Sequence, residues 1–259
     1  MNVALVRAHL TSLGVVDDRY ARQMLPPNHR RVASALRLPG LRRLGHSSFP
    51  YLAARTLLFD EFVSDALDGG VRQVVVVGAG YDSRAWRLAR PGVTFFEVDQ
   101  PATQADKRMR APDGGPVYVP ADVTDTHLAE KLAHAGFRPE EPTAFTAEGL
   151  VIYLTREAAA DLLATLSGLG SAGSRLAVSF ERGFERQPMT RRISAAYYRR
   201  AGETWRFRLR SDEASSFLSE AGWTLDRLHT PECLDRDHLN RTTLAGTLRT
   251  SSFAVDAKK

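Results

Sequence analysis

Cysteine, lysine and long apolar runs are all scarce in this chain of 259 residues. The single cysteine, Cys233, excludes an intramolecular disulfide bond and a cysteine-based metal cluster. No apolar stretch approaches the roughly eighteen residues that would indicate a membrane span. The amino terminus also lacks the basic region, apolar core and cleavage site of a signal peptide. We therefore expect a soluble, cytoplasmic globular protein with no membrane partner, as a composition of 43% hydrophobic and 25% charged residues also indicates.

Arginine greatly outnumbers lysine, and the formal net charge is +5. The arginines are spread along the chain and are locally dense only in residues 182–210, where aromatic residues such as Tyr197 and Trp205 lie between them. Such a segment could bind RNA, form a solvated helix face or hold an anionic substrate. Because the remaining arginines are dispersed, nucleic-acid binding is the less favoured interpretation.

The most informative stretch is 71–101, which predicts a strand, a glycine turn, a helix and a second strand. Four valines, Val74 to Val77, form a continuous apolar run of the kind that suits a strand buried on both faces of a parallel sheet. Residues 82–90 look helical, and Val93 to Val98 reads as the second strand. An acid follows that strand directly, as in folds that bind a nucleoside at the carboxyl ends of their strands.

The turn between these strands predicts which nucleoside is bound. Gly78 and Gly80 allow a tight turn and a close approach of the ligand, and Asp99 could accept hydrogen bonds from both ribose hydroxyls. The third glycine of the dinucleotide fingerprint is missing, because Ser83 stands in its place, and Asp82 would set a carboxylate near the pyrophosphate of NAD. S-adenosylmethionine has no phosphate and carries a cationic sulfonium and ammonium. We therefore favour S-adenosylmethionine as the cofactor over NAD, with a turn that has only a structural role as the remaining alternative.

The rest of the chain predicts a doubly wound α/β fold. Residues 1–68 show no strand pattern and are expected to be helical, with a last helix over 52–67. Further strands are expected at 117–120, 143–147, 174–181, 223–229 and 249–255, and helices at 102–110, 126–135, 156–168 and 211–221, the last two capped by Thr155 and Ser211.

Two further acids follow predicted strands. Asp122 could hydrogen-bond an adenine amino group or begin a helix, and Glu148 ends the fourth strand, where doubly wound sheets bind ligands. Arg55, in the last helix of the amino-terminal segment, has a surface ion pair with Asp60 or Glu61 as its simplest role.

Several ordered motifs over roughly residues 50–160 resemble the leucine carboxyl methyltransferase family. They are R-T-x-x-F-D from Arg55, V-V-G-A-G-Y-D-S-R from Val76, E-V-D-Q-P from Glu97, a downstream Lys107 and A-E-G-L-x-x-Y-L from Ala147. The chain is most similar to the family's actinobacterial branch of S-adenosylmethionine-dependent methyltransferases, some of which are polyketide O-methyltransferases. The resemblance implies a class I methyltransferase (Rossmann-like) fold: a seven-stranded, mostly parallel sheet with an antiparallel last strand and a helical amino-terminal cap. Residues 1–68 would form that cap, and 69–259 the cofactor-binding domain, with a substrate-side insertion at about 182–210.

The resemblance also implies roles for individual residues toward the cofactor. Gly80 belongs to the glycine turn that the cofactor approaches. Arg55 would hold the methionyl carboxylate, Gly78 would permit close approach, Asp99 would bind the ribose, Asp122 with the Val123 backbone would face the adenine, and Glu148 would lie beside the methionyl ammonium.

The acceptor side carries no compelling general base, so no catalytic residue is assigned. His46, His229 and His238 are candidates, but a lone histidine is more often a surface or hydrogen-bonded residue. A carboxylate acceptor is ionised near neutral pH and needs no base, whereas a phenol or alcohol does. We therefore expect an O-methyltransferase for a small acidic or phenolic metabolite, with carboxyl methylation favoured and a place in secondary metabolism. The alternatives are an NAD-dependent oxidoreductase, for which a Tyr-x-x-x-Lys pattern is missing, and a nucleic-acid-binding or RNA-modifying protein.

Overall fold

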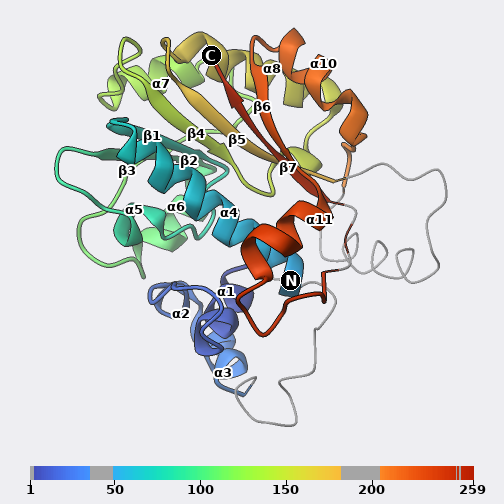
Figure 1. The fold of residues 1–259 in the computed structure, drawn as a ribbon. Coiled ribbons are helices and arrows are strands. Elements are labelled where there is room, and N and C mark those ends of the chain that lie inside the picture. The colour runs from blue at the N-terminus through green and yellow to red at the C-terminus, as the bar shows by residue number, and fades with distance from the viewer. Residues whose placement is uncertain (1–2, 36–48, 182–204, 249, 251) are drawn as a thin grey trace.

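The computed structural model describes residues 3–35, 49–181, 205–248, 250 and 252–259 (Figure 1). Its elements form one twisted sheet with helices on both faces and a group of helices below one edge of the sheet. No helix among these residues is long and apolar enough to cross a bilayer. The histidine candidate His46 and most of the arginine-rich segment, residues 182–204, lie outside the described residues.

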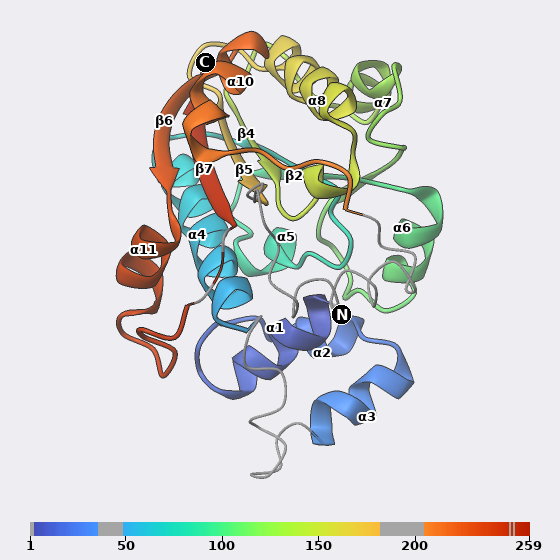
Figure 2. The same ribbon diagram turned by 90° about the vertical axis from the view of Figure 1, so that its right-hand side faces the viewer.

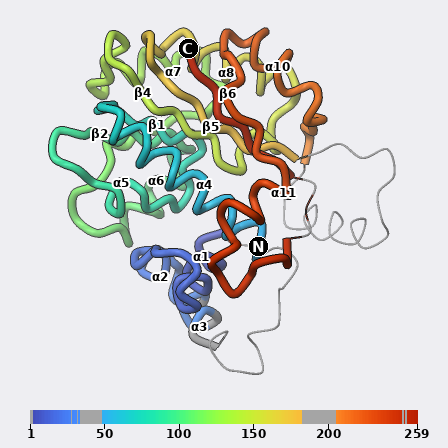
Figure 3. Tube along the Cα trace, in the orientation of Figure 1, coloured from blue at the N-terminus to red at the C-terminus, as the bar shows by residue number. Residues whose placement is uncertain are grey.

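Seven strands form the sheet in the order β3-β2-β1-β4-β5-β7-β6. β7 is antiparallel to its neighbours β5 and β6, and the pairs among the first five strands are parallel. Figure 3 shows β7 lying between β5 and β6. The strands are β1 (Gln73–Val77), β2 (Thr94–Asp99), β3 (Val117–Pro120), β4 (Thr143–Ala147), β5 (Arg175–Phe180), β6 (Thr224–His229) and β7 (Phe253–Lys258).

The helices divide between the two faces and the cap. On one face, α7 (Leu128–His134), α8 (Arg156–Leu169) and α10 (Ala214–Glu220) cover a core that contains Phe145 and Trp223. On the other, α4 (Phe49–Asp68), α5 (Arg84–Arg87), α6 (Pro101–Arg108) and α11 (Pro231–Leu234) lie against the sheet. The described residues also form α1 (Val3–Ser12), α2 (Ala21–Met24), α3 (Pro27–Ala35), the short 3-10 helices η1 (Val151–Tyr153) and η2 (Ser211–Glu213), and the π-helix η3 (Asp235–Leu239).

The amino-terminal helices α1–α3 lie at the sheet edge where β1 and β2 end (Figures 1 and 2). The guanidinium of Arg7 in α1 donates to the carbonyl of Tyr81 in the turn after β1. Arg110, just past α6, donates to the carbonyl of Met24 at 2.8 Å. These bonds place α1 and α2 beside the glycine turn and α6. The helices α1, α2 and α3 themselves agree with the helical character predicted for this segment.

The sequence predicted most element positions correctly. β3 and β4 have the expected bounds, and the hydroxyl of Thr155 accepts from the Ala158 N–H at 3.2 Å to begin α8 as expected. The helix expected at 82–90 is wrong in length: α5 covers only Arg84–Arg87. Asp82 accepts the Arg84 N–H at 2.6 Å before the helix, and Pro91 disfavours helical geometry in the residue before it.

Two boundaries near the carboxyl terminus were also wrong. The last strand spans Phe253–Lys258 instead of 249–255. Ser211 does not cap the helix before β6, because the helical segment begins with the turn η2, in which Glu213 accepts the Arg210 N–H at 3.1 Å. Glu213 thus accepts the N–H of the residue before the turn, whereas a capping serine would accept an N–H from inside the helix.

Candidate functional site

The strand order reverses between β1 and β4, which lie side by side in parallel, with Val76 opposite Thr146. Doubly wound sheets bind their ligands at the carboxyl ends of the strands where the order reverses. Six of the predicted site residues lie at these strand ends: Asp99 is the last residue of β2, and Gly78, Gly80, Asp122, Val123 and Glu148 come within three residues after β1, β3 or β4. Arg55 reaches the same edge from α4 through its contact with Glu148.

The glycine turn is closely packed and bound to the second strand. Gly78 has φ +66°, and a Cβ at this position would lie 2.7 Å from a methyl carbon of Leu150. The Gly80 N–H donates to the Oδ2 atom of Asp99 at 2.6 Å, and the Gln100 N–H donates to its Oδ1 atom at 2.7 Å. The structure therefore brings Gly80 and Asp99 together and fixes the carboxylate at the end of β2, with lone pairs left on both oxygens for further donors.

Asp122 and Val123 lie in the loop after β3, next to the strand that ends in Asp99. The exposed Asp122 carboxylate accepts the N–H and the hydroxyl of Thr124, at 2.9 and 2.7 Å, and these bonds lower its pKa. Asp122 thus shapes its own loop and does not cap α7, which begins at Leu128. Val123 packs against the core.

Arg55 and Glu148 are in direct contact. The Arg55 Nε atom lies 2.9 Å from Glu148 Oε1, and the two side chains are 10% and 8% exposed. The expected surface pair of Arg55 with Asp60 or Glu61 is therefore wrong. Gly149, at φ +66°, makes room for this contact, because a Cβ there would lie 3.0 Å from a guanidinium nitrogen of Arg55.

This pair belongs to a larger buried set of charges that we call the arginine–carboxylate network. Its side chains are at most 18% exposed, and each member contacts an opposite charge within the set. The members are the four arginines Arg7, Arg55, Arg84 and Arg87 and the four carboxylates Asp18, Asp60, Asp82 and Glu148. With all members ionised, the four positive and four negative charges give the network a net charge of zero.

Arg84 is at the centre of the network. Its side chain is fully buried, with Nε 2.7 Å from Asp60, and Nη1 2.5 Å from Asp82 and 2.6 Å from Glu148. Burial alone would raise the pKa of Glu148, but the guanidinium groups of Arg84 and Arg55 outweigh it and lower the pKa to about 2. Burial likewise works against ionisation of Asp82, and Arg84 again outweighs it, so the pKa of Asp82 is lowered. Both carboxylates are therefore ionised at neutral pH.

The position of Asp82 changes one argument made from the sequence. Its carboxylate does not project toward a phosphate site at the turn, because it is 5% exposed and turned inward to Arg84. The choice between S-adenosylmethionine and NAD therefore cannot depend on Asp82.

Sequence reasoning missed a chain of polar side chains beside Arg55. The Tyr51 side chain is hydrogen-bonded to those of Arg55 and Ser252, and the Ser252 hydroxyl donates to the Glu181 carboxylate. Burial is the main cause of a raised pKa for Tyr51, so its phenol is neutral. Tyr51 lies one helical turn before Arg55, a spacing that could have signalled the contact, whereas Ser252 and Glu181 meet it only through the fold.

A second buried pair, Glu97 with Lys107, lies on β2 and α6 at a distance of 2.5 Å. Lys107 Nζ also lies 5.5 Å from the centroid of the Trp86 ring. Burial raises the pKa of Glu97 to about 7, and the neighbouring ammonium offsets this only in part. The Lys107 of the sequence motif therefore has a partner two residues before Asp99.

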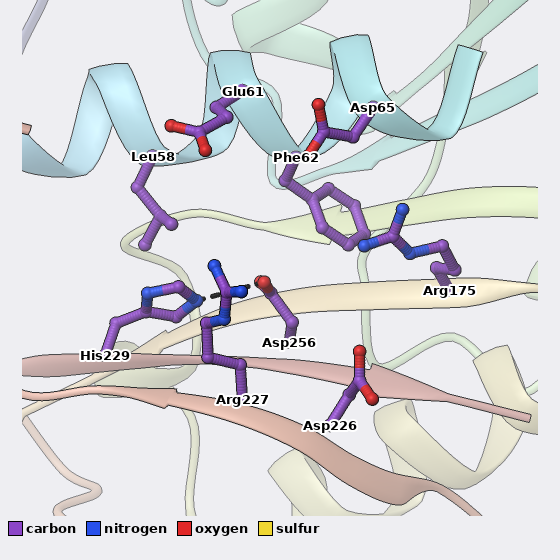
Figure 4. A pocket seen from close by; sticks show the side chains of 9 residues that line it. All are labelled: Leu58, Glu61, Phe62, Asp65, Arg175, Asp226, Arg227, His229 and Asp256. Carbon is purple, nitrogen blue, oxygen red and sulfur yellow. Dashed lines mark hydrogen bonds and ion pairs between the residues drawn. The ribbon is translucent and has the colours of Figure 1, made fainter. Parts of the chain in front are cut away.

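His229 lines a pocket beside α4 (Figure 4), and the ring of His238 lies 6.3 Å from the ring of His229. His229 is 2% exposed, and its Nε2 atom lies 3.0 Å from the carboxylate of Asp256. His238 Nδ1 lies 3.4 Å from Glu61, and burial lowers its pKa. Figure 4 shows Glu61 projecting from α4 on one side of the pocket, with His229 and Asp256 on the strands opposite.

This pocket encloses about 90 Å³, well below the roughly 300 Å³ at which small-molecule sites begin. In the structure each histidine is paired with a carboxylate, His229 with Asp256 and His238 with Glu61. Among the residues the structure describes, no cluster of three or more His, Cys, Asp and Glu side chains is arranged to hold a metal ion.

Solved structures share this architecture along nearly the whole chain. A protein of Thermobifida fusca described as a methyltransferase superposes with a TM-score of 0.60 at 17% sequence identity, covering 98% of this chain and 94% of that one. A DUF574-family protein of Streptomyces avermitilis superposes with a TM-score of 0.66 at 20% identity, covering 98% and 96%. These likenesses and the sheet order define the fold class as that of the class I S-adenosylmethionine-dependent methyltransferases.

The sequence comparisons identify the family. The leucine carboxyl methyltransferase family profile matches residues 1–167. A protein of Mycolicibacterium smegmatis named as an S-adenosyl-L-methionine-dependent methyltransferase is 40% identical over 218 residues, which span 75% of this chain and 67% of that protein. A protein of the same name from Mycobacterium marinum is 34% identical over 250 residues, spanning 89% and 78%. A third relative, from Parafrankia, is 38% identical over 180 residues. The aligned residues make up 67% of this chain but only 57% of that protein.

This chain belongs to the leucine carboxyl methyltransferase family. Its class is that of the S-adenosylmethionine-dependent methyltransferases, and neither an oxidoreductase nor a nucleic-acid-binding protein is favoured.

Proposed function

We propose that this chain transfers the methyl group of S-adenosylmethionine to an oxygen atom of a small acidic or phenolic metabolite, with a carboxylate the favoured acceptor and secondary metabolism the setting. The observation that carries the proposal is the Arg55–Glu148 pair at the edge where β1 and β4 end. The amino-acid end of the methionyl group is a zwitterion, with one carboxylate and one ammonium. Arg55 offers it a cation and Glu148 an anion, and because the network has no net charge, binding leaves no buried charge without a partner.

The residues at the site fit this cofactor. Arg55 would bind the methionyl carboxylate through its guanidinium fork, and Glu148 would accept from the ammonium. Asp99, held by two backbone N–H groups, would accept the ribose hydroxyls. Gly78 would let the cofactor approach the backbone, Gly80 would fix the turn, and Asp122 and Val123 would border the adenine.

When bound, the cofactor supplies an electrophilic methyl group on a sulfonium sulfur. The chain's part is to orient the acceptor oxygen and to exclude water, because an attacking carboxylate must lose hydration. The division into a cap of residues 1–68 and a catalytic domain of 69–259, with the acceptor-side insertion at about 182–210, belongs to this proposal. Its support is that α1–α3 lie at the same edge as the glycine turn.

Thermal unfolding with S-adenosylhomocysteine, with NAD as the control ligand, tests the cofactor. A ligand at 100 times its dissociation constant adds roughly 2.7 kcal/mol to the unfolding free energy, so the midpoint should rise visibly with S-adenosylhomocysteine alone. A rise with NAD alone would overturn the proposal.

A phenolic acceptor is the second candidate, favoured by the polar chain at Tyr51. A carboxylate can only accept, so Ser252 donates its single proton to Glu181, and Tyr51 is then the donor to Ser252. This chain of hydrogen bonds could carry an acceptor proton to Glu181. Methylation of benzoate, which has only a carboxylate, and of catechol, which has only phenols, followed by mass spectrometry in the wild type and in Glu181→Gln, separates the cases. Loss of catechol methylation alone would assign Glu181 as the base, and equal retention of both would exclude it.

A further inference from the structure

We propose that Arg84 is a positioning residue that holds the Glu148 carboxylate in place while Arg55 is engaged by the cofactor carboxylate. The inference rests on the proposed function, because it assigns Arg55 and Glu148 to the two charges of the methionyl group. It concerns a residue that touches neither end of that group and acts through Glu148.

The two arginines at Glu148 are held very differently. Arg55 binds the Oε1 atom through Nε, and its side chain is 10% exposed, so it has access to the site. Arg84 binds the Oε2 atom at 2.6 Å, and its side chain is fully buried. Each carboxylate oxygen of Glu148 therefore has its own arginine, and only one of these arginines is accessible to a ligand.

Besides Glu148 at the end of β4, Arg84 is held by α4, through two residues, and by the glycine turn. Its Nε atom donates to Asp60 on α4 at 2.7 Å, its Nη1 atom donates to Asp82 in the glycine turn at 2.5 Å, and its Nη2 atom donates to the Thr56 carbonyl at 3.3 Å. A guanidinium engaged at all three nitrogens cannot turn toward a ligand without breaking buried charged hydrogen bonds. Arg84 therefore keeps its contact with Glu148 whether or not Arg55 remains there.

This arrangement explains how the Arg55–Glu148 pair can open. If Arg55 alone held Glu148, its transfer to a ligand carboxylate would leave a buried anion without a cation, which is strongly unfavourable. With Arg84 in place, Glu148 stays ionised and its Oε1 atom becomes free to accept from an ammonium. The methionyl carboxylate thus takes the place of Glu148 at Arg55, and the methionyl ammonium takes the place of Arg55 at Glu148.

Isothermal titration with two ligands tests the inference. S-adenosylhomocysteine carries the amino-acid end, and 5′-methylthioadenosine lacks it. Arg84→Lys keeps the charge but replaces the planar fork by a compact ammonium, which cannot occupy the Nε and Nη positions together. We expect this variant to bind S-adenosylhomocysteine about ten- to a hundredfold more weakly, as the loss of a charged hydrogen bond predicts, and methylthioadenosine within about twofold of the wild type.

Two further variants make the result specific. Arg90→Gln breaks a surface ion pair with Asp68, whose side chains are 37% and 69% exposed, and should leave both affinities unchanged. Asp60→Asn leaves Arg84 present but weakens its anchor, and should reduce the preference for S-adenosylhomocysteine by a smaller factor. It also serves as the test if Arg84→Lys does not fold.

The outcomes are distinguishable. If the wild type binds neither ligand, the proposed function fails. If the wild type prefers S-adenosylhomocysteine and that preference is unchanged in Arg84→Lys and Asp60→Asn, the positioning role of Arg84 is refuted. Equal weakening of both ligands would also refute it, because a general loss of structure does not distinguish the amino-acid end.

Discussion

Replacement of Gly78 by alanine should cost more stability than the same replacement at Gly80, and the structure gives the reason for the difference. Both glycines have a left-handed backbone, with φ +66° and +48°. A Cβ at Gly80 would meet nothing within 4 Å, whereas a Cβ at Gly78 would lie 2.7 Å from one methyl carbon of Leu150 and 3.1 Å from the other. The two variants therefore share the backbone strain and differ in the collision.

The magnitudes follow from these two terms. Left-handed geometry costs a non-glycine residue about 1–2 kcal/mol, of which part is recovered because alanine restricts the unfolded chain. Gly80→Ala should therefore lose about 1 kcal/mol. Overpacking adds about 1–3 kcal/mol at Gly78, toward the lower end because Leu150 is only half-buried and can shift. Gly78→Ala should lose about 2–3 kcal/mol in total.

Urea unfolding of the two variants, with and without Leu150→Ala, measures both terms. The cost of Gly78→Ala should fall to that of Gly80→Ala when Leu150 is truncated, with the denaturant slope unchanged. An equal cost for the two glycines in the wild-type background, or a cost at Gly78 that is indifferent to Leu150, would refute the reasoning.

Other consequences can be measured in the same way. Lys107→Met should cost about 3–5 kcal/mol in urea unfolding because it leaves the buried Glu97 unpaired, and adding Glu97→Gln should recover most of this loss; a strictly additive pair would contradict it. The pKa of Glu97 is about 7 in the folded chain against 4.5 as its ordinary value, so the folded state holds the proton more tightly and the unfolding free energy should fall as the pH rises through this interval; Glu97→Gln should flatten that fall. Thr155→Ala should cost about 1 kcal/mol by removing the cap of α8, and Thr155→Ser should cost much less. Gly149→Ala should displace the Arg55 guanidinium, now 3.0 Å from the position of the added Cβ, and weaken S-adenosylhomocysteine binding more than methylthioadenosine binding; an unchanged ratio would contradict this.

Local signals explain why the sheet could be predicted so closely. Apolar runs that end in glycine, proline or acidic residues define β1 to β4. A strand that is buried on both faces needs apolar residues at nearly every position, so it is visible in the sequence as a continuous run. β7 was misplaced by several residues because its partners β5 and β6 are distant in the chain, and its register is set by those pairings. Where a strand begins and ends because of its pairing with distant strands, the residues of that strand alone do not show its bounds.

The contacts at the site also divide into those that the sequence could predict and those that it could not. The pairing of Gly80 with Asp99 was predictable because both follow strands of one local unit. The burial of Arg55 against Glu148 was not, since their contact joins a helix to a strand end 93 residues away along the chain. Arg84 ends the V-V-G-A-G-Y-D-S-R motif, but no role was assigned to it, because an arginine in a polar turn resembles a surface residue until Asp60 and Glu148 are brought around it.

The arginine–carboxylate network has a consequence for how related sequences can diverge. Each carboxylate of the network forms an ion pair with one or more arginines, and Asp60 pairs with both Arg84 and Arg87. Loss of any one member leaves a buried charge uncompensated, so single replacements are disfavoured even where neither partner is needed for chemistry. We therefore expect substitutions at these eight positions to occur as paired exchanges of one acid and one base. An alignment of homologous chains should show this as covariation between α4, the glycine turn and the end of β4.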